Sequence, residues 1–378
     1  MSTGARYSTE PRLVAGELSD IFAPPGAVRR VTSPTEWPAA AEIWRQLILD
    51  LEYGGVPPEP IGVYFEEHHC GIQHTWPGKP LYRGFRIHCR GGTAPFSLGA
   101  KLILPQSTSP VPVIINGDAC WPRQEDITRT VLERGYGLLI FDRTEAARDL
   151  NGEARKHRVG GLYDIYPGLR FGAISAWAWA YSRCLDLLYS LVEIDRARIV
   201  VSGHSRGGKT CLVAGLRDPR ISLINDNGGC AGGGAAYRYV GDGGESIGIV
   251  NDFPDWFDVR MRSFVGRESE LPFDQHCLLA ALAPRPVLLT YALDDRWSNP
   301  EGMVQSFWGA REAYRLLGAE ESIAFHLRPG GHAHDVDDWQ VLLDFADLQW
   351  HGAVKGRAFN HHPYEHLHPL FSWSAPQS

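Results

Sequence analysis

The stretch Arg198-Ile199-Val200-Val201-Ser202-Gly203-His204-Ser205-Arg206-Gly207-Gly208-Lys209-Thr210 decides the fold of this 378-residue chain. Its β-branched apolar run predicts a strand, and the apolar segment 211–216 that follows predicts a helix. Gly-x-Ser-x-Gly stands between them, and strand, sharp turn and helix in this order are the setting of a nucleophile elbow. The serine is then exposed at a helix N-terminus. A chain with 41 glycines can contain Gly-x-Ser-x-Gly by chance. The assignment of a nucleophile elbow therefore also needs an acid and a histidine further along the chain.

Composition limits the classes of function. The net charge is −7, and no run of Lys and Arg is present, so nucleic-acid binding is not expected. The seven cysteines are odd in number and include no Cys-x-x-Cys pair, so we expect neither a disulfide framework nor a zinc site. Neither a signal peptide nor a membrane-spanning run is visible. The default expectation is a cytoplasmic protein, or a secreted one if a leader was removed.

Strand and helix patterns alternate along the chain. Buried strands are predicted at 111–116, 137–142, 198–204, 221–226, 285–291 and 322–328, and helices at 36–51, 126–133, 172–192, 300–317 and 338–352. Two antiparallel strands are predicted at 84–89 and 96–104. The pattern favours an α/β fold, a three-layer αβα sandwich around a mostly parallel sheet with antiparallel N-terminal strands. Residues 1–34 are predicted to be a loose arm, and 35–378 a single domain with an insertion at about 237–273.

Two strand ends after the elbow carry the acid and the base that a serine nucleophile needs. Asp294 and Asp295 follow the strand 285–291, and His332 follows the strand 322–328 after a Gly-Gly turn. The carboxyl ends of parallel strands meet at one edge, where ligand and catalytic groups gather. The order Ser, Asp, His is that of the α/β-hydrolase fold. Histidine suits the role of base near neutral pH, and an aspartate fixes its tautomer.

Alternatives remain open for both partners of the serine. Asp226 ends the strand after the elbow and is a second candidate for the acid, and His334 is a second candidate for the base. The histidines at 361, 362, 366 and 368 lie in a polar tail whose spacing matches no standard metal site. The N–H of Arg206 is expected to be one oxyanion donor, and the loop 116–118 is the place expected to supply the other.

Several stretches resemble the glucuronoyl esterases, carbohydrate esterase family 15, and especially their bacterial branch. The family elbow is Gly-Cys/His-Ser-Arg-x-Gly-Lys, and residues 203–209 are similar at every position. The resemblance covers about residues 111–350 and includes Asn251-x-Phe253-Pro254-x-Trp256-Phe257, Leu271-Pro272-Phe273-Asp274-Gln275-His276, Asp295-Arg296-Trp297 and Gly330-Gly331-His332. The chain departs from the family pattern in two ways. No leader is visible, and Ser298-Asn299 stands before Pro300 where the family has a small residue and Asp.

The resemblance implies hydrolysis of an ester of 4-O-methyl-glucuronic acid by a Ser-His-Asp acyl-enzyme mechanism without a cofactor. By position, it implies that Ser205 is the nucleophile, His332 the base and Asp295 the acid, with Asp226 as the alternative. It also implies that Arg206 serves the oxyanion with main chain and side chain. Lys209 would bond the sugar hydroxyls, and Trp297 would pack near the sugar.

Two other functions stay open at this point. One is an intracellular esterase, lactonase or acyl-transfer enzyme that acts on a small metabolite or an acetylated sugar. The other is an inactive α/β-hydrolase scaffold that only binds. The expected partner is a small-molecule or carbohydrate ester, with no nucleic acid and no membrane, and the sequence leaves the oligomeric state unknown.

Overall fold

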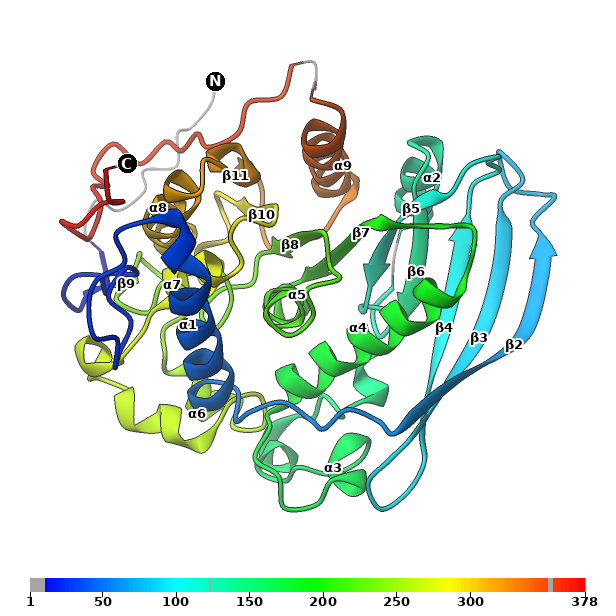
Figure 1. The fold of residues 1–378 in the computed structure, drawn as a ribbon, viewed down its shortest axis with the longest axis horizontal. Helices are drawn as coiled ribbons and strands as arrows, with labels where there is room; N and C mark the ends of the chain where they lie inside the picture. Colours follow the sequence, from blue (N-terminus) through cyan, green and yellow to red (C-terminus); the bar gives the residue numbers. More distant parts are fainter. Residues whose placement is uncertain (1–10, 123, 353–355, 378) are drawn as a thin grey trace.

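One large mixed sheet forms the centre of the molecule (Figure 1). The computed structural model describes residues 11–122, 124–352 and 356–377. Among these residues, nine strands pair in the order β11-β10-β8-β7-β5-β6-β4-β3-β2. Their bounds are β2 Gly62–Ile72, β3 Leu81–Arg90, β4 Phe96–Leu104, β5 Val111–Asn116, β6 Gly137–Phe141, β7 Ile194–His204, β8 Leu223–Asn227, β10 Val287–Ala292 and β11 Ile323–Arg328.

The six strands from β11 to β6 are parallel, and β4, β3 and β2 continue the sheet antiparallel. The predicted α/β fold, with a mostly parallel sheet and antiparallel N-terminal strands, is confirmed. The sequence pattern missed β2. This edge strand carries Glu66, Glu67, His68 and His69 in succession and is largely exposed, so it has no alternation of apolar and polar residues.

Helices cover both faces of the sheet, because alternate strand residues point to opposite sides. Val200 of β7 packs toward α2 and α9, whereas Ile199 and Val201 pack into the larger core on the other face. Figure 1 shows α2 and α9 on one side of the sheet and α4 and α5 on the other. The longer helices are α1 Trp37–Leu51, α2 Glu125–Glu133, α4 Ala173–Ser190, α5 Arg206–Arg217, α7 Gln275–Ala281, α8 Pro300–Leu316 and α9 Val336–His351.

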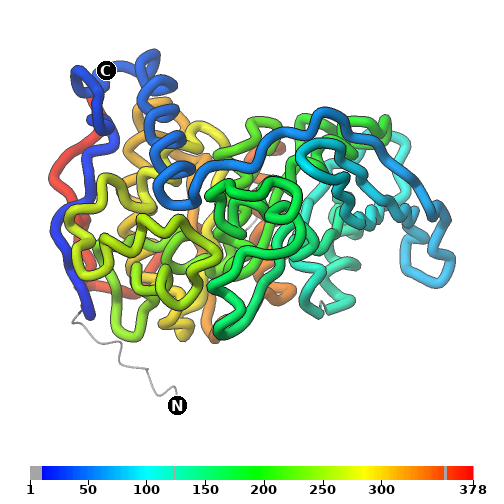
Figure 2. Tube along the Cα trace, turned by 90° about the horizontal axis from the view of Figure 1, so that it is seen from below, coloured from blue at the N-terminus to red at the C-terminus, as the bar shows by residue number. Residues whose placement is uncertain are grey.

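The N-terminal segment is packed from residue 11 onward, so the expectation of a loose arm is wrong for the residues described. Strand β1 (Leu13–Val14) pairs antiparallel with β9 (Tyr239–Val240) of the insertion. Leu18, Ile21 and Phe22 are buried, and the N–H of Leu18 donates to Leu370 O at 2.7 Å. Figure 2 shows this N-terminal segment, in dark blue, beside the C-terminal segment in red.

Short elements form the cover over one end of the sheet. They are η2 Arg143–Glu145, η3 Gly152–Lys156 and α3 Leu162–Ile165 in the segment 143–170, and α6 Ile249–Asp252, η4 Val259–Phe264 and η5 Glu268–Glu270 in the insertion. The other short helices are η1 Pro34–Glu36, η6 Arg296–Ser298 and η7 Glu320–Ser322. Figures 1 and 2 both show the segments 143–170 and 249–264 side by side, and Arg158 Nη2 donates to Phe257 O across them at 2.7 Å.

Candidate active site

Ser205 occupies a strained turn between β7 and α5. Its φ of 56° and ψ of −120° lie where few non-glycine residues are found. The strand and the helix approach so closely here that a Cβ on Gly203 would stand 2.5 Å from Gly207 O. The N–H of Ser205 donates to Asn227 O at 2.7 Å, which fixes the turn to the end of β8. The predicted strand, turn and helix are therefore present, with the serine at the helix N-terminus.

His332 and Asp295 meet at the same edge of the sheet. His332 Nδ1 lies 2.6 Å from Asp295 Oδ2, and the carboxylate is buried. Burial raises the pKa of Asp295, but the hydrogen bond from His332 and further hydrogen bonds from Ser298 outweigh it and hold this pKa below its ordinary value. A Cβ on Gly228 would lie 3.4 Å from His332 Cε1. The N–H of Ser205 is hydrogen-bonded to the main-chain oxygen of Asn227, the residue before Gly228. The serine and the histidine therefore lie on either side of the backbone at Gly228.

Asp226, the alternative acid, is not joined to the histidine. Its side chain is fully buried, and Oδ2 accepts hydrogen bonds from Gly234 N and Tyr291 Oη, each at 2.9 Å. Burial raises the pKa of Asp226 to about 6 although these hydrogen bonds oppose the shift. The structure therefore places Asp226 beneath the glycine-rich loop 228–234, where it organises the backbone.

His204 packs against His332, and His334 packs against His204. The ring centroids of His204 and His332 are 4.3 Å apart, and His334 stacks between His204 and Trp339. Burial, together with the neighbouring His332, lowers the pKa of His204 to about 4, so this ring is neutral at physiological pH. A cavity of about 310 Å³ opens beside these rings and is also lined by Trp121. His334 thus belongs to a wall of the site, and Asp295 pairs with His332.

Arg206 is held by an acid and by aromatic rings that the sequence did not connect to the elbow. Its Nη1 donates to Asp149 Oδ2 at 2.7 Å, and Asp149 belongs to the segment 143–170. The guanidinium lies 4.6 Å from the ring centroid of Trp256 and 5.7 Å from that of Phe253. Two cover segments thus converge on the side chain next to Ser205. The N–H of Arg206 belongs to the first helical turn, where N–H groups have no intrahelical partner.

Lys209 is buried, and it is paired with an acid that the sequence analysis missed. Its Nζ donates to Glu245 Oε2 at 2.9 Å and to Ala231 O, and only 2% of its side chain is exposed. Burial raises the pKa of Glu245, while Lys209 opposes the shift. The N–H of Glu245 donates to the main-chain oxygen of Trp297 at 2.9 Å, and the Trp297 side chain is about half exposed (52%). Trp297 therefore lies at the surface beside this buried ion pair.

The loop 116–118 does not provide the expected second oxyanion donor. The N–H of Gly117 donates to Tyr181 Oη at 2.9 Å, and the N–H of Asp118 donates to Asn116 Oδ1 at 3.3 Å. That expectation is wrong for the main-chain N–H groups of this loop, because they are already occupied within the fold.

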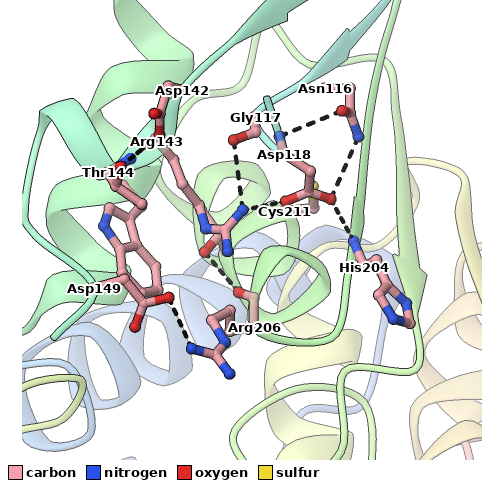
Figure 3. A network of polar contacts seen from close by, with 12 residues as sticks. Asn116, Gly117, Asp118, Asp142, Arg143, Thr144, Asp149, His204, Arg206 and Cys211 are labelled. Carbon is pink, nitrogen blue, oxygen red and sulfur yellow. Dashed lines mark hydrogen bonds and ion pairs between the residues drawn. The ribbon is translucent and has the colours of Figure 1, made fainter. Parts of the chain in front are cut away.

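The side chain of Asp118 instead supports the elbow (Figure 3). Asp118 Oδ2 accepts from the His204 N–H at 2.8 Å, and Oδ1 is paired with the fully buried guanidinium of Arg143. The Arg143 guanidinium lies 4.4 Å from the Trp121 ring centroid and 5.0 Å from that of Trp177. The loop after β5 and the segment after β6 thus hold the residue before the serine in place.

Metal-ligating groups, thiols and long apolar helices can be described for residues 11–122, 124–352 and 356–377. No group of three or more His, Cys, Asp or Glu side chains in these ranges is arranged to hold a metal ion. All seven cysteines lie within these ranges and carry free thiols. No helix in the described part of the chain combines the length and the apolar character needed to cross a bilayer.

Comparison with known proteins identifies relatives of this arrangement. A family model described as "Glucuronyl esterase, fungi" matches residues 87–318. The "Carbohydrate esterase MZ0003" of an unknown prokaryotic organism is 37% identical over 203 residues, which make up 49% of this chain and 46% of that protein. The 4-O-methyl-glucuronoyl methylesterase of Hypocrea jecorina (strain QM6a) is 31% identical over 281 residues, or 69% of this chain and 58% of that protein. The chain thus spans about half the length of these two relatives.

Solved structures show the same fold over nearly the whole chain. The carbohydrate esterase family 15 (CE15) glucuronoyl esterase of Caldicellulosiruptor kristjansonii superposes with a TM-score of 0.81 at 29% identity, covering 95% of this chain and 97% of that one. A glucuronoyl esterase from Solibacter usitatus superposes with a TM-score of 0.79 at 26% identity, covering 90% of this chain and 99% of that one.

Proposed function

The chain belongs to the CE15 glucuronoyl esterase family, and we propose that it hydrolyses esters of 4-O-methyl-glucuronic acid through a serine acyl-enzyme. The observation that carries this proposal is the 2.6 Å contact between His332 Nδ1 and Asp295 Oδ2 at the edge of the sheet where Ser205 stands. A serine hydroxyl needs a base whose tautomer is fixed, and this pairing supplies one. The activity for which the Hypocrea jecorina relative is named, 4-O-methyl-glucuronoyl methylesterase, supports the choice of substrate.

In the proposed reaction, Ser205 Oγ attacks the ester carbonyl carbon while His332 Nε2 accepts the hydroxyl proton. The developing oxyanion is stabilised by the Arg206 N–H and by the Arg206 guanidinium. Collapse of the tetrahedral intermediate breaks the bond to the alcohol, which leaves with the proton from His332. Water then attacks the acyl-enzyme with the same base, and the free uronic acid departs. Asp295 remains ionised and stabilises the imidazolium in both halves.

Sugar recognition is proposed for the residues beside the serine. The Lys209 ammonium has three N–H donors, of which Glu245 and Ala231 take two, so one remains for a sugar hydroxyl. Trp297 offers an exposed ring at the same edge, and such a ring suits the apolar face of a sugar. The Lys209–Glu245 pair is buried, which favours a fixed orientation of the bound uronate.

The proposal is tested with methyl and benzyl esters of glucuronic acid, compared with acetylated xylan and simple aryl acetates. We expect turnover of the uronate esters and loss of all turnover in Ser205→Ala, while a circular-dichroism melt shows that the variant still folds. Turnover of aryl acetates without turnover of uronate esters would refute the substrate and favour an esterase for small metabolites. Undiminished turnover in Ser205→Ala would refute the acyl-enzyme.

A further inference from the structure

A groove with a cationic lining lies between the segment 143–170 and the insertion. Its volume is about 520 Å³. One carboxylate, Asp258, contributes to its wall, together with five cationic side chains: Arg155, Lys156, Arg158, Arg170 and Arg262. Because the chain as a whole carries a net charge of −7, this concentration of cations needs an explanation.

Three acids of this region form ion pairs, and one of them, Glu153, pairs with Lys156 of the lining at 2.6 Å. Asp258 Oδ1 accepts from Arg260 Nε at 2.8 Å, so the carboxylate of the groove wall is neutralised by a cation outside the lining. Asp50 binds both Arg260 and Arg170, and it is more than half exposed. Exposed pairs of this kind are weak and exchange readily with other anions.

Three of the lining guanidiniums form no ion pair with a carboxylate in the described part of the chain. Arg155 donates to Leu150 O, Asp252 O and Asn151 Oδ1. Arg158 donates to the main-chain oxygens of residues 170, 171 and 257. Arg262 is exposed and forms no ion pair with a described residue. Neutral oxygens satisfy hydrogen bonds but leave the positive charge in place. The buried carboxylate of Asp255 lies near Arg155 and Arg158 and offsets part of their charge, so the two guanidiniums together keep a net positive charge in a partly buried wall.

The groove adjoins the proposed active site through one aromatic side chain. The Arg155 guanidinium lies 3.7 Å from the ring centroid of Phe253, and the Arg206 guanidinium lies 5.7 Å from the same centroid. Burial lowers the pKa of Arg155; the carboxylates of Asp255 and Asp149 oppose this shift, and the nearby Arg206 adds to it. Phe253 therefore stands beside both Arg155 of the groove and Arg206 of the proposed active site.

We propose that this groove binds a free carboxylate of an acidic glycan, carried one or two sugar residues away from the esterified uronic acid. The inference rests on the proposed function, because it places the scissile ester beside Ser205. A carboxylate is the anion that sugars of this class carry, and guanidinium groups bind it through paired hydrogen bonds. The preferred substrate is then a uronate-rich oligosaccharide bearing one ester.

A binding experiment tests the groove independently of turnover. Glucuronate, a linear trimer of glucuronate and neutral xylotriose are titrated into the active enzyme by calorimetry. Arg262→Glu is the test variant, because this exposed side chain forms no ion pair that the substitution would break. Arg196→Glu is the matched control: it makes the same charge change at an exposed position near the start of β7, at the opposite end of the strand from Ser205.

We expect the trimer to bind more tightly than xylotriose, and its Kd to rise at least five-fold in Arg262→Glu but stay within two-fold in Arg196→Glu. The Kd of monomeric glucuronate should be the same in both variants, and added salt should weaken trimer binding. Equal affinity for the trimer and xylotriose would overturn the proposal. Equal losses of trimer binding in the two variants would also overturn it.

Kinetics separates this proposal from the proposed function. Arg262→Glu should keep kcat/KM for methyl glucuronate and lower it for the trimer that carries one terminal methyl ester. Hydrolysis of both esters with the same kcat/KM in wild type and variant leaves the esterase in place and refutes the groove. Selective trimer binding without hydrolysis of any uronate ester supports the groove and refutes the proposed function.

Discussion

Replacing Asp295 by asparagine should cost about three to four orders of magnitude in kcat. Asp295 Oδ2 faces His332 Nδ1 at 2.6 Å, and hydrogen bonds from Ser298 also stabilise the carboxylate. An asparagine that keeps its oxygen toward Ser298 turns its NH₂ group toward His332. The histidine must then present an acceptor at Nδ1 and a proton at Nε2, which prevents it from taking the proton of Ser205.

The loss of charge adds to this effect, because a neutral amide does not stabilise the imidazolium that forms in the transition state. A loss of three to four decades corresponds to about 4 to 5.5 kcal/mol of transition-state stabilisation. The assay is kcat for benzyl glucuronate at pH 7, with the thermal midpoint measured in parallel to show that the variant is folded.

Asp226→Asn is the matched comparison. The pKa of Asp226 is raised to about 6 by burial, so its neutral form is already accessible, and Oδ2 can be replaced by an amide oxygen that accepts from the same donors. We expect a loss of kcat of less than about ten-fold and a loss of stability of about 1 to 3 kcal/mol. A much larger loss of kcat in Asp226→Asn than in Asp295→Asn would refute the assignment of the acid.

Two further variants, and the pH dependence of the stability of Asp226→Asn, test the surroundings of the elbow. Asp149→Asn should lower kcat about ten-fold at nearly unchanged KM, because the Arg206 guanidinium loses its partner at 2.7 Å. When the same substitution is made in Arg206→Gln, steady-state kinetics should show no further loss of kcat. Lys209→Met should lower the free energy of unfolding at pH 7 by about 3 to 5 kcal/mol, because Glu245 is left buried without its cation. The double variant Lys209→Met/Glu245→Leu should regain this stability in urea denaturation but should remain inactive. The pKa of Asp226 is about 6 in the folded state and 3.8 in the free group, so the folded state keeps this proton to a higher pH. As the pH rises from about 4 to 7, the free energy of unfolding of the wild type should therefore fall by about 3 kcal/mol relative to that of Asp226→Asn. A difference in unfolding free energy that stays constant over this range would contradict the burial of a titrating Asp226.

The groups that the sequence located best are those that follow parallel strands. Ser205 follows β7, Asp295 comes three residues after β10, and His332 comes four residues after β11. Each strand has a strong apolar run, and the rule that parallel strands share a carboxyl edge brings their ends together. The same reasoning could not separate Asp226 from Asp295, because both lie at that edge. Only the three-dimensional structure shows that Asp226 turns below the glycine-rich loop.

The residues that the sequence did not reveal belong to segments without periodicity. Asp149 lies in the irregular segment 143–170, and Glu245 follows Asp242-Gly243-Gly244 in the insertion. Pairings across 57 and 36 residues have no signature in spacing. The sequence did give one indication of these acids. The first turn of α5 carries Arg206 and Lys209 among small residues, and cations that become buried require counter-charges. That requirement predicts that acids exist but not where they lie.

The two cations explain how the cover and the core form one site. A cation in the first turn of a helix is unfavourable, because the N-terminus of the helix already carries positive charge. Arg206 is compensated by Asp149 from the segment 143–170, and Lys209 by Glu245 from the insertion. Each cover segment therefore gains electrostatic stabilisation only when it is seated on α5. It follows that neutralising Arg206 should loosen the segment 143–170, and neutralising Lys209 should loosen the insertion, and hydrogen exchange of each segment in the two single variants can measure this.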